Sequence, residues 1–190
     1  MATLALAVGS ACVAQISDEP DEDLDQATAS VTSGKAVVVK DNKHFCLFLP
    51  KHGQTVGESE TNAKPSCTVG GLAPGAGTLP SGAVSAHEVK NANFIQITGR
   101  LDVQKLGLRS GDSGGQYDNY TSPSTPHGSP SGASCQGYKY FVEMVEPAAH
   151  RYCIRCCDEV SQNFGDAHRA CIKNHSTTGC PAIMPGANFD

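Results

Sequence analysis

The chain has no tryptophan, and aromatic residues make up only 6% of its 190 residues. It also lacks any run of about 18 apolar residues, the length that a membrane-spanning helix needs, so we expect no membrane insertion. No segment repeats with a period of about 20–50 residues, which excludes the architectures that stack such units. The length fits one domain of ordinary size, which has room for a modest hydrophobic core.

A basic stripe is missing as well. The net charge is −5, but six of the nineteen acidic residues lie in the run 18–25, and the other thirteen nearly balance the fourteen lysines and arginines. A nearly neutral body cannot release many counterions from a phosphate backbone, so we expect no nucleic-acid partner. The acidic run offers too few apolar residues to pack, and residues 15–34 are predicted to be a disordered arm or a propeptide.

Cysteine, by contrast, is abundant. Cys12 lies in an apolar N-terminal segment, and eight further cysteines follow it at Cys46, Cys67, Cys135, Cys153, Cys156, Cys157, Cys171 and Cys180. An even number of cysteines behind a secretory leader predicts a disulfide framework formed in an oxidising compartment. Eight cysteines allow on the order of a hundred pairings, and the sequence does not choose among them.

Residues 1–14 are predicted to be the signal peptide that this interpretation needs. The segment 3–14 is apolar and ends in the small residue Ala14 before Gln15, although no lysine or arginine precedes it. We therefore expect a secreted, extracellular protein, whose oligomeric state the sequence leaves open.

Runs of β-branched and aromatic residues predict a mainly β fold. The expected strands are 35–40, 44–49, 83–90, 93–99, 138–145 and 151–157, and one short helix is expected at 166–175. In 93–99 Ile95 and Ile97 alternate with Phe94, Gln96 and Thr98, so one face of this strand should lie in the core. The predicted fold is a single small β-rich domain at 35–190, cross-linked by disulfides, with long loops and at most one or two short helices.

Residues 110–137 consist largely of Gly, Ser, Pro, Thr and Asn, a composition that predicts a long exposed loop. Cys135 is expected to tether it. Because long exposed loops often carry recognition, the region from Ser110 to Cys135 is the expected contact with a cell-surface receptor or a glycan.

This loop contains Gly111-Asp112-Ser113-Gly114-Gly115, the letters that surround the nucleophilic serine of chymotrypsin-like proteases. Those enzymes need a histidine and an aspartate ahead of the serine, on two β-barrels that require more residues than precede Ser113. Glycine, aspartate and serine in this pattern are also typical of a turn. We favour the turn and expect no enzymatic activity. The alternative is a serine hydrolase with Ser113 as nucleophile and His87 or His150 as base.

A second alternative is a zinc-binding module. Close thiolate and imidazole ligands are typical of tetrahedral zinc, and the C-terminal part of the chain has them at Cys153, Cys156, Cys157, His168, Cys171 and His175. Metal binding requires reduced cysteines, whereas a secreted chain would oxidise them, and adjacent cysteines more often join two different disulfides. We therefore expect disulfides here, with no metal and no cofactor.

Two sequons are present, at Asn119-Tyr120-Thr121 and Asn174-His175-Ser176. Both lie in segments that the sequence predicts to be exposed. Asn119 and Asn174 are therefore the expected N-glycosylation sites of a secreted chain.

Several motifs together resemble the secreted cysteine-rich glycoproteins of mushroom-forming and related fungi known as macrophage-activating glycoproteins. The motifs are Phe45-Cys46-Leu47, residues 94–99, residues 112–115, residues 153–158 and residues 179–186, and the resemblance covers roughly residues 35–190. It implies an extracellular N-glycosylated protein that acts at a cell surface or wall and stimulates immune cells. It implies no catalytic residue set, and it makes Ser113 part of a turn.

Overall fold

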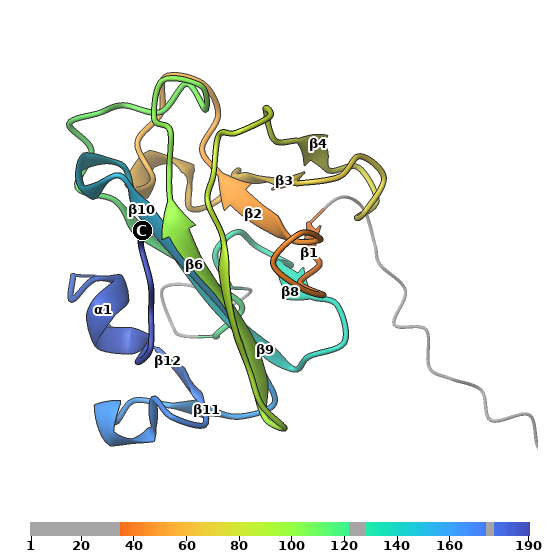
Figure 1. Ribbon diagram of the computed structural model, residues 1–190, viewed down its shortest axis with the longest axis vertical. Helices are drawn as coiled ribbons and strands as arrows, with labels where there is room; N and C mark the ends of the chain where they lie inside the picture. The colour runs from red at the N-terminus through yellow and green to blue at the C-terminus, as the bar shows by residue number, and fades with distance from the viewer. Residues whose placement is uncertain (1–34, 122–127, 174–176) are drawn as a thin grey trace, which may run out of the picture.

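The computed structural model describes residues 35–121, 128–173 and 177–190. The predicted signal peptide, the acidic arm, Cys12, Asn174 and His175 lie outside these residues. At the centre is an antiparallel sheet of five strands in the order β5-β6-β10-β9-β7 (Figure 1). Its strands are β5 (His87–Lys90), β6 (Phe94–Arg100), β7 (Gly115–Asp118), β9 (Tyr140–Glu146) and β10 (Arg151–Cys157).

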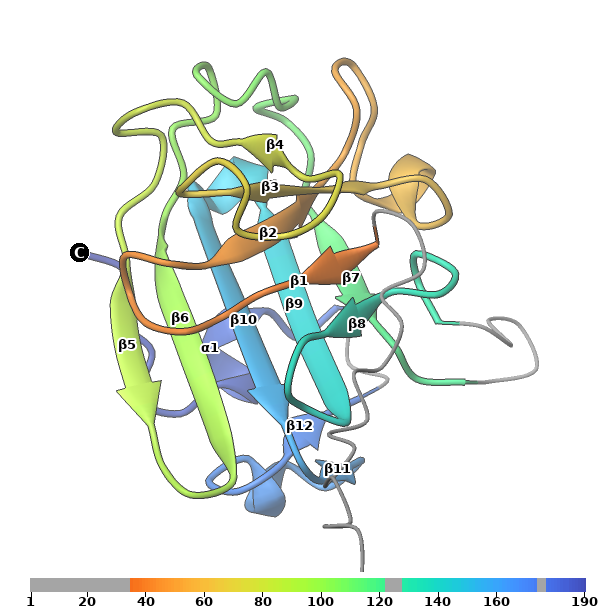
Figure 2. The ribbon, with the colours of Figure 1, turned by 90° about the vertical axis from the view of Figure 1, so that its right-hand side faces the viewer.

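Two further layers cover the two faces of this sheet, as Figures 1 and 2 show. One layer consists of β1 (Ala36–Val37), β2 (Cys46–Leu49), β3 (Lys64–Cys67), β4 (Gly77–Thr78) and β8 (Ser134–Cys135). The other consists of β11 (Val160–Ser161), β12 (Cys171–Ile172) and α1 (Cys180–Ile183). Single 3-10 turns occur at Gly57–Ser59, Pro147–Ala149 and Phe164–Asp166. The mainly β, disulfide-rich fold is confirmed, with α1 as the one α-helix of the described residues.

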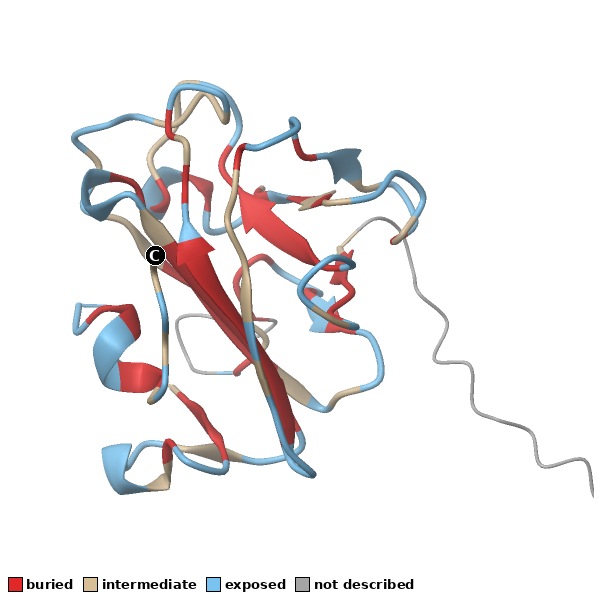
Figure 3. Ribbon diagram, viewed as in Figure 1, coloured by how far each residue is buried: buried red, intermediate tan, exposed pale blue. Residues whose placement is uncertain are grey.

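The alternation of side chains along β10 shows how the central sheet packs against both outer layers. Tyr152, Ile154 and Cys156 pack into the core that faces β1 to β4, whereas Cys153 and Cys157 pack into the core that faces α1 and β12. Successive residues of a strand point to opposite faces, so a strand covered on both sides must be buried at every position. The three central strands are accordingly buried along nearly their whole length (Figure 3).

This arrangement corrects the expectation that only one face of 93–99 is core. Ile95 and Ile97 lie in one core, but Gln96 and Thr98 on the opposite face are also fully buried. Their burial is possible because both find partners: Gln96 accepts from Arg155, and the hydroxyl of Thr98 donates to the carbonyl of Asn188 at 3.0 Å. The chain after β10 folds back over this face.

The prediction of a helix at 166–175 is wrong. The structure has a 3-10 turn at Phe164–Asp166, followed by β12. The carbonyls of Ala167 and Ala170 accept hydrogen bonds from the guanidinium of Arg155, and the amide of Cys171 donates to the carbonyl of Glu159 at 3.0 Å. These partners use groups that an α-helix would need for its own i to i+4 bonds.

The single long loop expected at 110–137 is also wrong in part. Residues 115–118 form β7, an edge strand of the central sheet, in which Gln116 and Tyr117 are buried. Residues 134–135 form β8, which pairs in parallel with β1. Of the other expected strands, 35–40 and 83–90 are longer than the structure has them, since only Ala36–Val37 and His87–Lys90 form ladders.

None of the helices in the described residues is long and apolar enough to cross a membrane.

Candidate functional site

The eight cysteines predicted to form a framework are paired into four disulfides. The pairs are Cys46–Cys67, Cys135–Cys156, Cys153–Cys180 and Cys157–Cys171. β10 supplies a cysteine to three of them. Because Cys156 and Cys157 are consecutive in a strand, they point to opposite faces, and each joins a different layer to the sheet. The alternation within residues 151–157 is the sequence signal that could have indicated these two directions.

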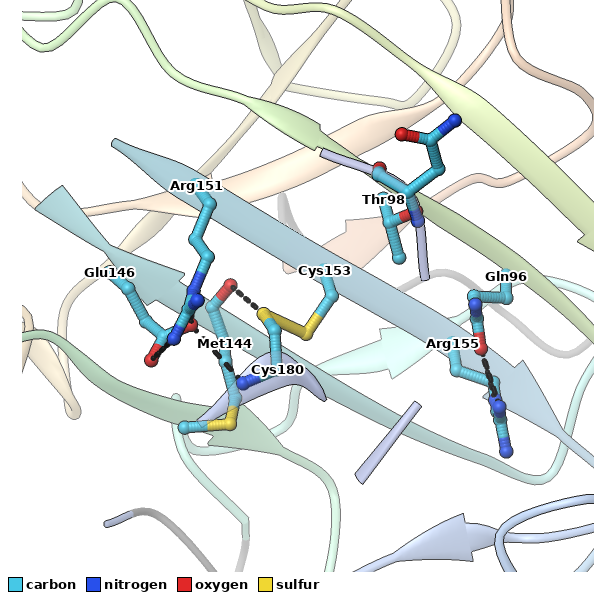
Figure 4. The surroundings of a disulfide bond; sticks show 9 residues. Gln96, Thr98, Met144, Glu146, Arg151, Cys153, Arg155 and Cys180 are labelled. Carbon is cyan, nitrogen blue, oxygen red and sulfur yellow. Dashed lines mark hydrogen bonds and ion pairs between the residues drawn. A yellow bond between two sulfur atoms is a disulfide. The ribbon is translucent and has the colours of Figure 1, made fainter. Parts of the chain in front are cut away.

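The surroundings of Cys153–Cys180 show how one such link is supported (Figure 4). Glu146 at the end of β9 is 7% exposed, and its Oε2 accepts from the amide of Cys180 at 3.1 Å and from Nε of Arg151 at 2.7 Å. The carboxylate thus satisfies an orphan amide at the start of α1 and pairs with a guanidinium. The start of α1 is therefore fixed to the sheet by a disulfide and by the hydrogen bond from the Cys180 amide to Glu146.

Those residues of the zinc alternative that the structure describes, all but His175, are not assembled into a metal site. Cys153, Cys156, Cys157 and Cys171 are in disulfides, and His168 is exposed. Across residues 35–121, 128–173 and 177–190, no group of three or more His, Cys, Asp or Glu side chains is placed to hold a metal ion.

The loop 111–115 is built as a turn. Asp112 Oδ1 accepts from the amide of Gly114 at 2.9 Å, and Asp112 Oδ2 accepts from the amide of Val56 at 2.8 Å. Gly114 has φ of +95°, and a Cβ there would lie 2.1 Å from the carbonyl oxygen of Val145, so only glycine fits. The side chain of Ser113 is exposed and makes no hydrogen bond to a histidine of the described chain.

The two histidines considered as bases lie elsewhere in the fold. Nε2 of His87, on β5, is 3.0 Å from the carbonyl oxygen of Asp190. His150 follows the 3-10 turn at Pro147–Ala149 with φ of 52° and is exposed at one end of the central sheet. Neither makes the hydrogen bond to Ser113 that a nucleophile and its base require.

Asn119 has a structural role beside its sequon. Its Nδ2 donates to the carbonyl of Lys139 at 2.8 Å, and its Oδ1 accepts from the amide of Phe141 at 3.0 Å. These bonds extend the pairing of β7 and β9 by one residue. The second amide hydrogen of Asn119 is left for a glycosidic bond, and glycosylation there stays a prediction.

A buried carboxyl group lies on the face of β9 that packs against β2. Glu143 is 0% exposed, and its Oε2 accepts from the amide of Phe48 at 3.0 Å, while its Oε1 has no partner in the described part of the chain. Burial raises the pKa of Glu143 well above its usual range, and the hydrogen bond from Phe48 opposes this only partly. Burial therefore favours the neutral form of the Glu143 carboxyl group.

We expect this group to make the fold less stable as pH rises. Below about pH 4.3 the carboxyl is protonated in both states; above that, the unfolded chain releases its proton while the folded chain keeps it, so stability falls until the raised pKa is passed. Each unit by which the pKa is raised costs about 1.4 kcal/mol. Glu143→Gln should remove this loss and increase the melting temperature at neutral pH, as measured by thermal unfolding from pH 4.5 to 8.

The exposed Glu88 on β5 provides the control, because Glu88→Gln should leave the pH dependence nearly unchanged. Parallel curves for wild type and Glu143→Gln would contradict the prediction.

The loops after β2, β4 and β6 gather at the end of the molecule drawn uppermost in Figures 1 and 2. Residues of these loops line two neighbouring hollows. The first, the arginine cleft, has a volume of about 530 Å³ and is formed mainly by residues 82–85 and 100–104 with His150. The amide of Asp102 donates to the carbonyl of Ala83, and the amide of Leu101 donates to the carbonyl of His150. These bonds hold the walls of the cleft together.

The second hollow, the lysine groove, has a volume of about 270 Å³. Its lining consists of Leu49, Pro50, Lys51, Lys64, Ser66, Thr78, Leu79, Pro80, Lys105 and Leu106. Lys105 connects the two hollows, since its ammonium group is 3.3 Å from the carbonyl oxygen of Gly82 in the wall of the arginine cleft. No local sequence pattern marks this surface, because its residues come from four separate segments.

The structure thus defines a disulfide-rich β protein of three layers with an open, basic surface at one end. No family model matches the chain, and no solved structure matches it. It is similar to two proteins of the fungus Mycosarcoma maydis, Appressorium protein ROW2, with 28% identity over 137 residues, and Appressorium protein ROW1, with 27% identity over 158 residues. The matches cover 64% and 77% of this chain, but only 44% and 35% of the two relatives.

The chain therefore spans less than half the length of these curated relatives. Its similarity to fungal proteins agrees with the expected fungal origin and is compatible with an extracellular location. Neither relative bears the name of a macrophage-activating glycoprotein. The immune-stimulating role implied by the sequence motifs has no support in these comparisons.

Proposed function

We propose that this chain is a secreted, non-enzymatic protein of the fungal cell surface or wall, N-glycosylated at Asn119 and Asn174. The observation that carries the proposal is that all eight cysteines of residues 35–190 are joined in disulfides, three of which link an outer layer to the central sheet. Disulfides of this density persist in oxidising compartments and are rare in the cytosol.

Similarity to two fungal proteins named as appressorium proteins is consistent with the same location. The open basic surface at one end of the fold is a suitable contact for a surface or wall component. A receptor or glycan is therefore the partner class that we propose, and no immune activity is included.

Expression of the full chain in a yeast host tests the location. We expect the protein in the medium or the wall fraction, processed near Gln15, reduced in mass by endoglycosidase, and with eight cysteines alkylated only after reduction. A matched variant without residues 1–14 should stay inside the cell with free thiols. An unprocessed, unglycosylated wild-type chain that is retained in the cytosol with free thiols would overturn the proposal.

A further inference from the structure

The lysine groove gathers three positive charges with little counter-charge nearby. Lys51 and Lys64 are exposed, and their ammonium groups make no ion pair or hydrogen bond to any described residue. Lys105 has a weak partner, as its Nζ is 3.9 Å from Asp102 Oδ2 and both side chains are largely exposed. No aspartate or glutamate lines the groove. Three cations that repel one another on an otherwise nearly neutral body favour an anionic ligand.

The rest of the groove is suited to a ligand that is more than a simple ion. Its apolar part includes Leu49 and Leu79, which are 8% and 6% exposed, and the rings of Pro50 and Pro80. Ser66 and Thr78 add hydroxyl groups to the lining. A ligand with apolar ring faces, hydroxyl groups and carboxylates would find a matching group for each.

The arginine cleft extends this surface. Arg100 is exposed, its guanidinium has no ion pair among the described residues, and it lies in the same cleft as His150. The two hollows are neighbours, because Lys105 of the lysine groove reaches the carbonyl oxygen of Gly82 in the wall of the arginine cleft, which Asp102 also lines. A surface with several cations in neighbouring hollows fits a linear polymer that carries charge at regular intervals.

The composition of the lining decides which polymer fits. Neutral sugar chains and single-stranded nucleic acids are commonly held by stacking on aromatic rings, but neither hollow has a Phe, Tyr or Trp in its lining. A lipid surface is flat, whereas these hollows are concave. Recognition must then come from charge together with small apolar and hydroxyl groups.

We propose that the lysine groove and the arginine cleft bind a linear acidic polysaccharide, a chain of carboxylated sugars, with Lys51, Lys64 and Lys105 as the main contacts for its carboxylates. The choice of a polysaccharide rests on the proposed function at a surface or wall. The binding itself is a property of the purified protein and is tested apart from its location.

The test compares two polymers that differ only in charge. Full-length protein is titrated with polygalacturonate and with the fully methyl-esterified polymer, at low and at high salt. We expect binding to the acidic polymer that weakens with salt, because exposed charges are screened, and little binding to the ester. Equal binding of both polymers, or no binding to polygalacturonate, would overturn the proposal.

Two triple variants with the same change in net charge locate the site. Lys51→Gln, Lys64→Gln and Lys105→Gln together should weaken binding about tenfold or more, which corresponds to about 1.4 kcal/mol. Lys40→Gln, Lys90→Gln and Lys139→Gln together change exposed lysines outside the groove and should change the affinity less than about twofold. Thermal unfolding of both variants checks that they fold alike.

Equal losses in the two triple variants would show attraction by net charge alone and would overturn the site. Tighter binding to vesicles that contain phosphatidylserine than to polygalacturonate would replace the polysaccharide by a lipid surface. If the protein binds the polymer but is not found at the proposed location in yeast, the proposed function is contradicted and the binding site is not.

Discussion

Arg155→Leu is expected to lower the free energy of unfolding by about 3 kcal/mol or more, since it orphans three buried acceptors and each costs about 1–3 kcal/mol. Arg155 is 0% exposed and faces the C-terminal layer from the middle of β10. Its guanidinium donates to Gln96 Oε1 at 3.0 Å from Nε and to the carbonyl of Ala170 at 2.9 Å, and it also bonds the carbonyl of Ala167. Leucine leaves all three oxygens buried without a donor.

The charge of Arg155 is balanced by dipoles rather than by a carboxylate. Burial lowers its pKa to about 10, so it is still charged at neutral pH, and its guanidinium lies 4.0 Å from the ring centroid of Phe94. Arg155→Lys should therefore lose most of the same stability, because an ammonium group cannot reproduce the fork of donors.

Denaturant unfolding measures both changes. The matched control is Arg169→Leu. Arg169 lies in the segment before β12, close in sequence to Ala167 and Ala170, but it makes exposed ion pairs with Glu159 and Asp166. Exposed pairs contribute about 0–1 kcal/mol, so this variant should stay close to wild type. Equal stabilities for Arg155→Leu and Arg169→Leu would contradict the role given to Arg155.

Removal of the Cys157–Cys171 disulfide is the second change with a large expected effect. We expect Cys157→Ala with Cys171→Ala to cost about 2–5 kcal/mol and to reduce the secreted yield severely. This bond closes a segment of sequence separation 14 and attaches β12 to β10. Replacing both cysteines avoids a leftover thiol that could pair wrongly. The measurements are the secreted yield and the melting temperature.

Reduction of the wild type supplies a control, since full reduction should lower its melting temperature at least as far as the double variant. An unchanged yield and melting temperature in the double variant would contradict the framework. Arg155 and Cys171 hold the same short segment, so the two changes should not be additive when combined.

The strands of the central sheet could be predicted because each is a contiguous run with its own pattern. Residues 93–99, 138–145 and 151–157 correspond closely to β6, β9 and β10. The burial of the polar side chains on these strands could not be predicted. Gln96, Thr98 and Arg155 have the chemistry of surface residues, and only the return of residues 159–173 and 177–190 over the sheet makes them interior.

That covering layer has little signal of its own. β11, β12 and α1 contain two, two and four residues, too few for a period of 2 or 3.6 to show. The lysine groove was missed for a related reason. Leu49, Lys64, Thr78 and Lys105 lie far apart in sequence, and no local pattern connects side chains that only the fold brings together.

The positions of the disulfides have a consequence for a molecule that meets proteases outside the cell. One bond lies between Cys46 and Cys67, and the other three lie between Cys135 and Cys180. None crosses residues 68–134, which contain β5, β6 and β7. A single cut in that stretch would therefore give two chains held together by noncovalent contacts alone, and they would part in denaturant without any reducing agent.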